Sequence, residues 1–172
     1  MEFLDLAKKR YSCRKYKSDK VEEEKINKIL EAARLAPTAA NNQPCRILTI
    51  QSEEGLEKMK KVTNFTFDAP LVFVVFSDLR ECWYHPFEDL NSVSIDPSIV
   101  ATHMTLEAAD LDLGSLMILG YSPSFLGREF DVPPYLFPNM ILAVGYEAED
   151  SVPNPRHENR KEIEEFTFYE SF

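Results

Sequence analysis

The feature that most constrains the fold is an apolar run at residues 71–77, with the sequence LVFVVFS. A run without the polar–apolar alternation of a half-exposed strand is typical of a strand buried on both faces. Such a strand needs apolar cover on two sides. With 172 residues, 44% of them hydrophobic, the chain is long enough to supply that cover from one core. We therefore expect a single domain spanning residues 1–172.

Helical and extended patterns alternate along the rest of the chain. In residues 21–35 the apolar side chains fall on one stripe of a helix, which Pro37 then ends. Residues 97–111 follow the same period but leave little polar surface, so we expect that helix to be central. Further helices are expected at residues 3–10 and 53–62, strands at residues 45–51, 140–146 and 163–169, and a long loop at residues 78–94. The pattern predicts an α+β fold in which a small sheet is flanked by helices.

The charge balance excludes some classes of partner. Nineteen Lys and Arg residues stand against 29 Asp and Glu residues, which gives a net charge of −10. That charge disfavours non-specific nucleic-acid binding and attraction to an anionic membrane. Neither a signal peptide nor a membrane-spanning apolar run is visible, so we expect a cytoplasmic protein. Three widely spaced cysteines fit a reducing compartment, and with three histidines they show no metal-ligand spacing, so no metal site is expected.

One basic cluster stands out against this acidic background, at residues 10–16 (RYSCRKY). Arg10 and Arg14 could hold a phosphate through paired hydrogen bonds, and Ser12 offers a hydroxyl to a sugar or polyol oxygen. The same residues also suit a solvated basic loop between two helices. Taken alone, the cluster favours that simpler interpretation.

Residues 36–44 (APTAANNQP) form an uncharged segment with two prolines, small side chains and three carboxamides. Small side chains let a flat ligand approach the backbone, and carboxamides offer a donor and an acceptor to the edge of a heterocycle. A helix stop followed by an Asn-rich turn into a strand explains the segment equally well. The usual dinucleotide and P-loop glycine fingerprints are absent. The residues alone leave both interpretations open.

Several motifs, taken in order along the chain, resemble the FMN-dependent nitroreductase family. They are Arg10-x-Ser12-x-Arg14, Ala36-Pro-Thr-Ala-x-Asn-x-Gln-Pro44, Asp96-Pro-Ser-Ile99, Thr102-His-Met104, Leu106-Glu-Ala-Ala109, Leu113-Gly-Ser115, Gly120, Val144-Gly-Tyr146 and His157-x-x-Arg160-Lys161. Because the motifs match in order and spacing over almost the whole chain, the resemblance is specific. It implies a small, mostly antiparallel sheet flanked by helices, in an intertwined homodimer.

The resemblance also implies which residues bind FMN, in clefts at the subunit interface. The phosphate and ribityl chain are matched by Arg10, Ser12 and Arg14, with Arg160 as a further cation from near the C-terminus. The stretch that reaches the flavin from the partner subunit is matched by Pro37, Thr38, Ala39 and Asn41, with Gln43 as a candidate helper. The turn whose backbone N–H groups approach flavin N5 and O4 is matched by Leu119 and Gly120.

The activity implied is transfer of a hydride from NADH or NADPH to flavin N5. A small acceptor such as a nitroaromatic or a quinone is then reduced, in a ping-pong mechanism. The flavin carries this chemistry, so no side chain is nominated as a catalytic acid or base. A flavin-binding carrier or sensor with little turnover would use the same residues and is the alternative. An acidic interaction module without a cofactor is a third hypothesis, and it leaves the ordered motifs unexplained.

Three positions depart from the family pattern. Ala40 stands where glycine is common, Cys45 where an aromatic residue is common, and Asp112 where the first glycine of Gly-Leu-Gly is usual. We expect Asp112 to be a surface residue at the end of a helix, where its carboxylate opposes the helix dipole.

The C-terminal tail is too apolar for a free end. Its aromatic residues are Phe166, Phe168, Tyr169 and Phe172. Because such side chains are rarely left in water together, we expect residues 162–172 to pack on the partner subunit.

Overall fold

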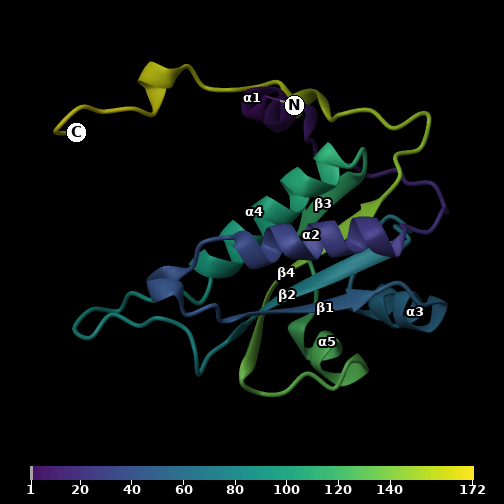
Figure 1. Ribbon diagram of the computed structural model, residues 1–172, viewed down its shortest axis with the longest axis horizontal. Coiled ribbons are helices and arrows are strands. Elements are labelled where there is room, and N and C mark those ends of the chain that lie inside the picture. The colour runs from purple at the N-terminus through teal and green to yellow at the C-terminus, as the bar shows by residue number, and fades with distance from the viewer. Residues whose placement is uncertain (1) are drawn as a thin grey trace.

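The computed structural model describes residues 2–172, and at its centre lies a four-stranded antiparallel sheet (Figure 1). Its strands are β1 (Cys45–Ile50), β2 (Leu71–Asp78), β3 (Gly114–Ile118) and β4 (Leu136–Gly145), in the order β1-β2-β4-β3. All eight residues of β2 are buried, because β1 and β4 pair with its two edges and helices cover both of its faces. The predicted α+β fold with a helix-flanked antiparallel sheet is confirmed.

Alternate residues of β2 enter two separate apolar clusters. Phe73 and Val75 face helices α2 (Glu23–Leu35) and α4 (Ile95–Asp110) on one side of the sheet. Val72 and Val74 face the other side, where α3 (Glu53–Val62) and α5 (Pro123–Glu129) lie. The remaining helix, α1 (Phe3–Lys9), packs against α4. The sheet therefore lies between two helical layers, as Figure 1 shows.

Most of the predicted elements are confirmed within a few residues at their ends. The exceptions are β3 and α5, which the sequence analysis did not predict, and the expected strand at residues 163–169, which is wrong for this chain. Residues 163–165 form a 3-10 turn, and no strand runs beside the residues that follow. A strand needs a neighbour to pair with, and the tail has none within its own chain. Across residues 2–172, no helix is both long enough and apolar enough to span a bilayer.

The last part of the chain, residues 149–172, is called here the C-terminal segment. It runs past α1 and ends away from the helices and the sheet, drawn in yellow in Figure 1. None of its residues is buried, and Phe166, Tyr169 and Phe172 are 62%, 83% and 105% exposed. This segment presents a large apolar surface that its own chain does not cover.

Candidate functional site

A pocket of basic and polar side chains lies beside the start of β3, and it is called here the anion-binding pocket after the kind of ligand that these side chains suit. Its cavity of about 260 Å³ is lined by Ser12, Arg14, Asn154, Arg156 and His157. No carboxylate lines this cavity, although the whole chain carries a net charge of −10. Two guanidinium groups and a hydroxyl suit a dianionic phosphate, which arginine binds through paired hydrogen bonds.

The extended segment that carries Ser12 and Arg14 is held against the sheet by its backbone. The Cys13 N–H donates to the carbonyl of Ser115 at 3.0 Å, and Ser12 forms a parallel bridge with the same residue. The Cys13 side chain is fully buried against Gly114, where an added Cβ would lie 2.7 Å from Cys13 Sγ. Glycine at position 114 is thus what allows the segment to approach β3 this closely.

A buried tyrosine fixes the same segment at its start. The Tyr11 hydroxyl donates to the Glu147 carboxylate at 2.9 Å and lies 2.9 Å from Ser151 Oγ. Burial raises the pKa of Tyr11 to about 12, and Glu147 acts in the same direction. The hydroxyl therefore stays protonated at neutral pH and remains a donor to Glu147.

The structure separates the three arginines and the serine hydroxyl that were expected around a phosphate. Ser12 and Arg14 share the anion-binding pocket, whereas Arg10 lines a neighbouring cavity of about 290 Å³ with Lys9 and Lys17. Arg160 is exposed, and its Nη1 donates to the carbonyl of Asn159 at 2.8 Å. These two arginines lie outside the lining of the anion-binding pocket in the single chain.

Arg156 is the cation of this pocket that the sequence analysis missed. It lies in a 3-10 turn, η2 (Pro155–His157), whose start is capped by Asn154, since Asn154 Oδ1 accepts from the Arg156 N–H at 3.0 Å. The His157 Nε2 lies 3.2 Å from the carbonyl of Lys8 and ties this turn to α1. The Asn-Pro pair that begins the turn was the one available signal, and it does not by itself point to a ligand.

The expected backbone turn of Leu119 and Gly120 lies beyond the other end of β3. Five residues of strand span about 17 Å, so β3 separates this turn from the anion-binding pocket by that length. Thr63 Oγ1 donates to the Gly120 carbonyl at 2.7 Å, and a Cβ on Gly120 would lie 2.8 Å from the Phe65 ring. Leu119 is 72% exposed and Gly120 is exposed as well, so this turn lies at the surface.

Residues 37–43, called here the site segment, adopt an unusual backbone. Ala40, Asn41 and Gln43 have φ values of 52°, 56° and 52°, in the left-handed region. That region costs a residue with a Cβ about 1–2 kcal/mol, less for Asn, and it favours glycine. Ala40 thus stands at a position that glycine would occupy without strain.

The site segment does not share a cavity with the Leu119–Gly120 turn. Thr38 and Gln43 line a cavity of about 300 Å³ between α2 and β1. Leu119 lines a different cavity, of about 420 Å³, together with Ser94 and Ser98 from the start of α4. The site segment leads into the edge strand β1, and the turn follows the opposite edge strand β3.

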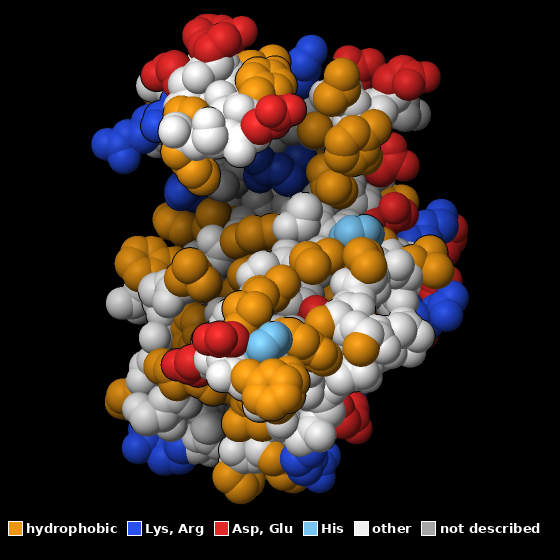
Figure 2. All heavy atoms as spheres, turned by 90° about the vertical axis from the view of Figure 1, so that its left-hand side faces the viewer, with side chains coloured by type: hydrophobic (Ala, Val, Ile, Leu, Met, Phe, Trp, Pro, Cys, Tyr) orange, Lys and Arg blue, Asp and Glu red, His pale blue; other side chains and the backbone are white. Residues whose placement is uncertain are grey.

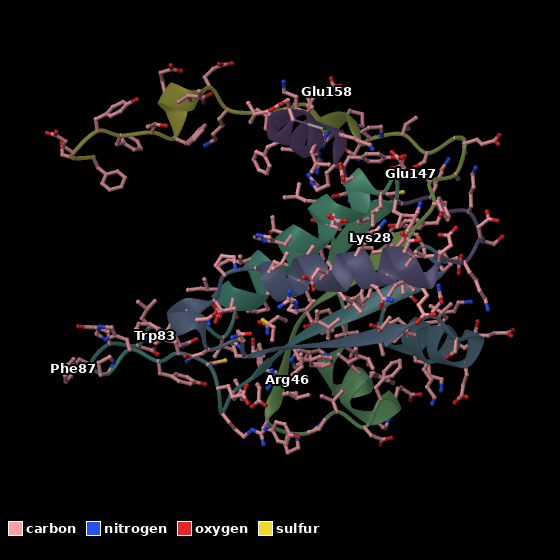
Figure 3. All side chains as sticks on the ribbon, in the orientation of Figure 1. Lys28, Arg46, Trp83, Phe87, Glu147 and Glu158 are labelled. Atoms are coloured by element: carbon pink, nitrogen blue, oxygen red, sulfur yellow. The ribbon has the colours of Figure 1, made fainter. Side chains whose placement is uncertain are left out.

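Figure 2 shows the face that these segments border. A hollow separates the C-terminal segment and α1 above from the helices and sheet below, with Lys and Arg side chains at its back and hydrophobic side chains around it. Figure 3 shows Trp83 and Phe87 on the loop between β2 and α4, which projects from the same side of the molecule. Phe87 is 88% exposed there. No group of three or more His, Cys, Asp or Glu residues in the described part of the chain is placed to hold a metal.

A second charged cluster, outside the anion-binding pocket, lies at the end of β2. The Asp78 side chain is 1% exposed and accepts two hydrogen bonds from the Arg80 guanidinium, at 2.8 and 2.6 Å. These bonds, together with the Arg80 N–H, hold the pKa of Asp78 down at about 2. Both carboxylate oxygens are used, so this cluster fixes the start of the loop that follows β2.

Asp112 is the surface residue that was expected at the end of a helix. It follows α4 with φ at 58°, and the Leu113 N–H donates to the Ala108 carbonyl at 2.8 Å, as in a helix end that normally takes glycine. The Lys9 ammonium pairs with its carboxylate and lowers the pKa of Asp112. That ion pair compensates for the unfavourable position of the carboxylate beside the helix C-terminus.

One edge strand of the antiparallel sheet, β3, thus has a cationic pocket at one end and an exposed turn at the other. Comparison with known proteins identifies the family of the chain. The model of the nitroreductase family matches residues 7–64. A nitroreductase family protein from Clostridium difficile 630 has 42% identity and a TM-score of 0.93, with both chains covered completely. This chain belongs to the nitroreductase family.

Two further relatives carry more specific names. A protein of Methanothermobacter thermautotrophicus, provisionally named NADH dehydrogenase/NAD(P)H nitroreductase, is 31% identical over 159 residues, which cover 87% of this chain and 80% of that protein. The structure of an FMN-dependent nitroreductase from Clostridium difficile R20291 has a TM-score of 0.79 at 26% identity. That likeness covers 99% of this chain and 100% of the other.

Proposed function

We propose that this chain is an FMN-dependent oxidoreductase that takes a hydride from NADH or NADPH and reduces a small acceptor such as a nitroaromatic or a quinone. The observation that carries the proposal is the carboxylate-free pocket of Ser12, Arg14 and Arg156 at one end of β3, with the Leu119–Gly120 backbone at the other. FMN, when bound, supplies the hydride-accepting and hydride-donating centre. The donor leaves before the acceptor enters, in a ping-pong mechanism.

The residues present fit the two ends of FMN. The anion-binding pocket offers guanidinium groups and a hydroxyl to the phosphate, and the local attraction outweighs the negative net charge because exposed charges farther away are screened. At the other end, the Leu119–Gly120 backbone offers amide groups that can hydrogen bond to a ring edge. In this proposal the chain positions the cofactor and excludes water, and no side chain acts as an acid or a base.

The site is proposed to need two copies of the chain. The site segment and the Leu119–Gly120 turn line different cavities within one chain, and the C-terminal segment leaves its aromatic side chains exposed. A homodimer in which residues 162–172 of one subunit pack on the other accounts for both features. The surface we assign to the partner's C-terminal segment is the free edge of β1 and the cavity beside it, the one that Thr38 and Gln43 line. Leu30, Ala33 and Ile47 supply apolar lining there, and Arg34 and Arg46 also border it.

The first test is the visible absorption spectrum of the purified protein, recorded before and after adding NADH or NADPH without air. We expect a yellow protein that bleaches with at least one of the two nucleotides. A yellow protein that fails to bleach would favour the carrier or sensor. A colourless protein that takes up no added FMN would overturn the assignment.

A second test compares the arginines around the phosphate. Arg14→Ala and Arg156→Ala should each weaken FMN binding about tenfold or more, because each removes a charged hydrogen-bond donor to phosphate. Arg160→Ala, measured in the same fluorescence titration, decides whether the cation implied by the family also contacts FMN. Riboflavin, which lacks the phosphate, is the control ligand, and its affinity should be unchanged by all three substitutions.

A further inference from the structure

Asp96 carries an unusual carboxylate in the first turn of α4. Its side chain is 1% exposed, and Oδ1 accepts a hydrogen bond from the Ala39 N–H at 2.9 Å. Its other oxygen, Oδ2, is the one buried side-chain nitrogen or oxygen atom within residues 2–172 that has no hydrogen-bond partner. An unpaired buried carboxylate oxygen is costly, so a role beyond packing is needed to explain why an acid stands here.

The residue that Asp96 holds belongs to the strained site segment. Inside that segment, the Asn41 N–H donates to the Thr38 carbonyl at 3.0 Å, and the Gln43 N–H donates to Thr38 Oγ1 at 3.0 Å. These bonds shape the turn but do not fix it to the body of the molecule. The Asp96 bond does so, because it ties the first residue of the 3-10 turn η1 (Ala39–Asn41) to a helix.

The start of α4 also lies beside the other part of the site. Ser94 and Ser98, on either side of Asp96 in sequence, line the cavity that contains Leu119. One helical turn thus contacts the site segment through Asp96 and borders the Leu119–Gly120 turn through the two serines. It is therefore the element best placed to set where the site segment stands.

We propose that Asp96 is a positioning residue for the cofactor, which holds the site segment in its left-handed conformation through the Ala39 N–H. This inference rests on the proposed function, in which the site segment contacts FMN. The Asp96 Oδ1 atom is a side-chain acceptor on a helix, so its bond to the Ala39 N–H anchors the strained backbone to a rigid element. Asp96 touches no reacting group and acts only through the backbone that it anchors.

The bond can be removed from either side. Asp96→Ala deletes the acceptor, and Asp96→Asn keeps an oxygen acceptor of the same shape. Ala39→Pro deletes the donor, and proline fits there because Thr38 is extended (φ −133°, ψ 156°) and Ala39 is outside the left-handed region. Thr105→Ala is the matched control, since Thr105 is 2% exposed on the same helix and its hydroxyl donates to the Thr102 carbonyl at 3.0 Å.

The readouts are the dissociation constant of FMN, from quenching of its fluorescence, and the melting temperature of the FMN-free protein. Titrations are run at a temperature where every variant is folded. Asp96→Ala and Ala39→Pro should each weaken FMN binding about tenfold, and the double variant should be no weaker than either one. Asp96→Asn should stay within about threefold of wild type, because its oxygen still accepts from Ala39. Thr105→Ala should lower the melting temperature without changing FMN affinity.

The outcomes separate this inference from the proposed function. If the wild-type protein binds no FMN, the proposed function fails. If the wild type binds FMN and Asp96→Ala binds it equally well, the positioning role alone is wrong. Equal weakening by Thr105→Ala would also overturn it, because the effect would then follow from loss of helix stability. If Asp96→Ala does not fold, Ala39→Pro decides by the same criterion.

Discussion

The central sheet and the two surface segments, residues 37–43 and 149–172, are built in opposite ways. In β2 every residue is buried and each face packs into an apolar cluster. The site segment instead holds three non-glycine residues in the left-handed region, and the C-terminal segment buries none of its side chains. The interior of the sheet is packed within one chain, whereas the segments carry backbone strain and exposed apolar surface that a partner or ligand would offset. Stability and proposed function are thus located in different parts of the molecule.

The largest effect is expected from making the C-terminal segment polar, which tests whether it serves the dimer and not the fold. Replacing its apolar residues by serine should abolish the dimer and FMN binding, while the chain remains folded because these residues contribute nothing to its core. The residues changed are Ile163, Phe166, Phe168, Tyr169 and Phe172. Light scattering gives the oligomeric state, and circular dichroism gives the fold.

Deleting residues 162–172 should have the same effect. The control is Glu164→Gln with Glu170→Gln, which alters the charge of the segment but keeps its apolar surface. A dimer that still holds FMN after the serine replacement or the deletion would show that the segment is dispensable.

Gly114→Ala tests how far stability depends on close packing against the sheet. Its Cβ would meet Cys13 Sγ at 2.7 Å and Cys13 Cβ at 2.8 Å, in a place without room. We expect the free energy of unfolding to fall by about 1–3 kcal/mol, as for overpacking in a core. Chemical denaturation of the FMN-free protein measures it. The same substitution at Gly127, where nothing lies within 4 Å, should be neutral or stabilising, and equal losses at both positions would contradict the packing argument.

Acid should weaken the ion pair of Asp78 and Arg80 at the end of β2. The pKa of Asp78 lies at about 2 in the folded chain, below its ordinary value of 3.8, because Arg80 binds the charged form. The unfolded chain therefore takes up this proton first. The stabilisation from Asp78 is complete above about pH 5 and is lost as the pH falls towards 2. Asp78→Asn should remove that part of the pH dependence of the free energy of unfolding. If the free energy of unfolding falls equally in the two proteins from pH 5 to 2, the prediction is wrong.

Ala40→Gly should give the smallest effect, and with the opposite sign. Glycine adopts φ of 52° without strain, which regains about 1–2 kcal/mol, and its greater freedom in the unfolded chain takes back about 0.5–1 kcal/mol. We expect a net gain of up to about 1 kcal/mol in the free energy of unfolding, measured with denaturant. A loss of stability would mean that the Ala40 methyl group packs in a way that outweighs the backbone strain.

Long, strongly patterned elements were predictable from the sequence, and short ones were not. Helix α2 has a clear apolar stripe and β2 an unbroken apolar run, and both were expected near their observed bounds. Strand β3 has five residues and α5 has seven, too few to establish a period. Both are stabilised by packing against β4 and α3, which local sequence does not encode.

The candidate site could likewise be predicted only where local sequence determines how the side chains are arranged. Ser12 and Arg14 lie two residues apart in an extended segment, so their side chains share a face and reach one pocket. Arg10 ends α1, and the change of backbone direction there turns it into the neighbouring cavity. No pattern in the sequence separates Arg156 from Arg160, since the choice depends on how a 3-10 turn packs 140 residues after the basic cluster. The burial of Asp96 is likewise a property of the folded molecule.

Strand β2 is synthesised before one of its two neighbours in the sheet, and this order exposes it to aggregation. Its sequence is apolar, rich in β-branched and aromatic residues and almost without charge, which is the composition of segments that assemble edge to edge between chains. Strand β1 is made first and can protect one edge, but β4 is made only after α4, β3 and α5. Until then the other edge of β2 stays open in the growing chain. The yield of folded protein should therefore depend on how quickly the last third of the chain follows, with slow synthesis or partial unfolding favouring association through residues 71–78.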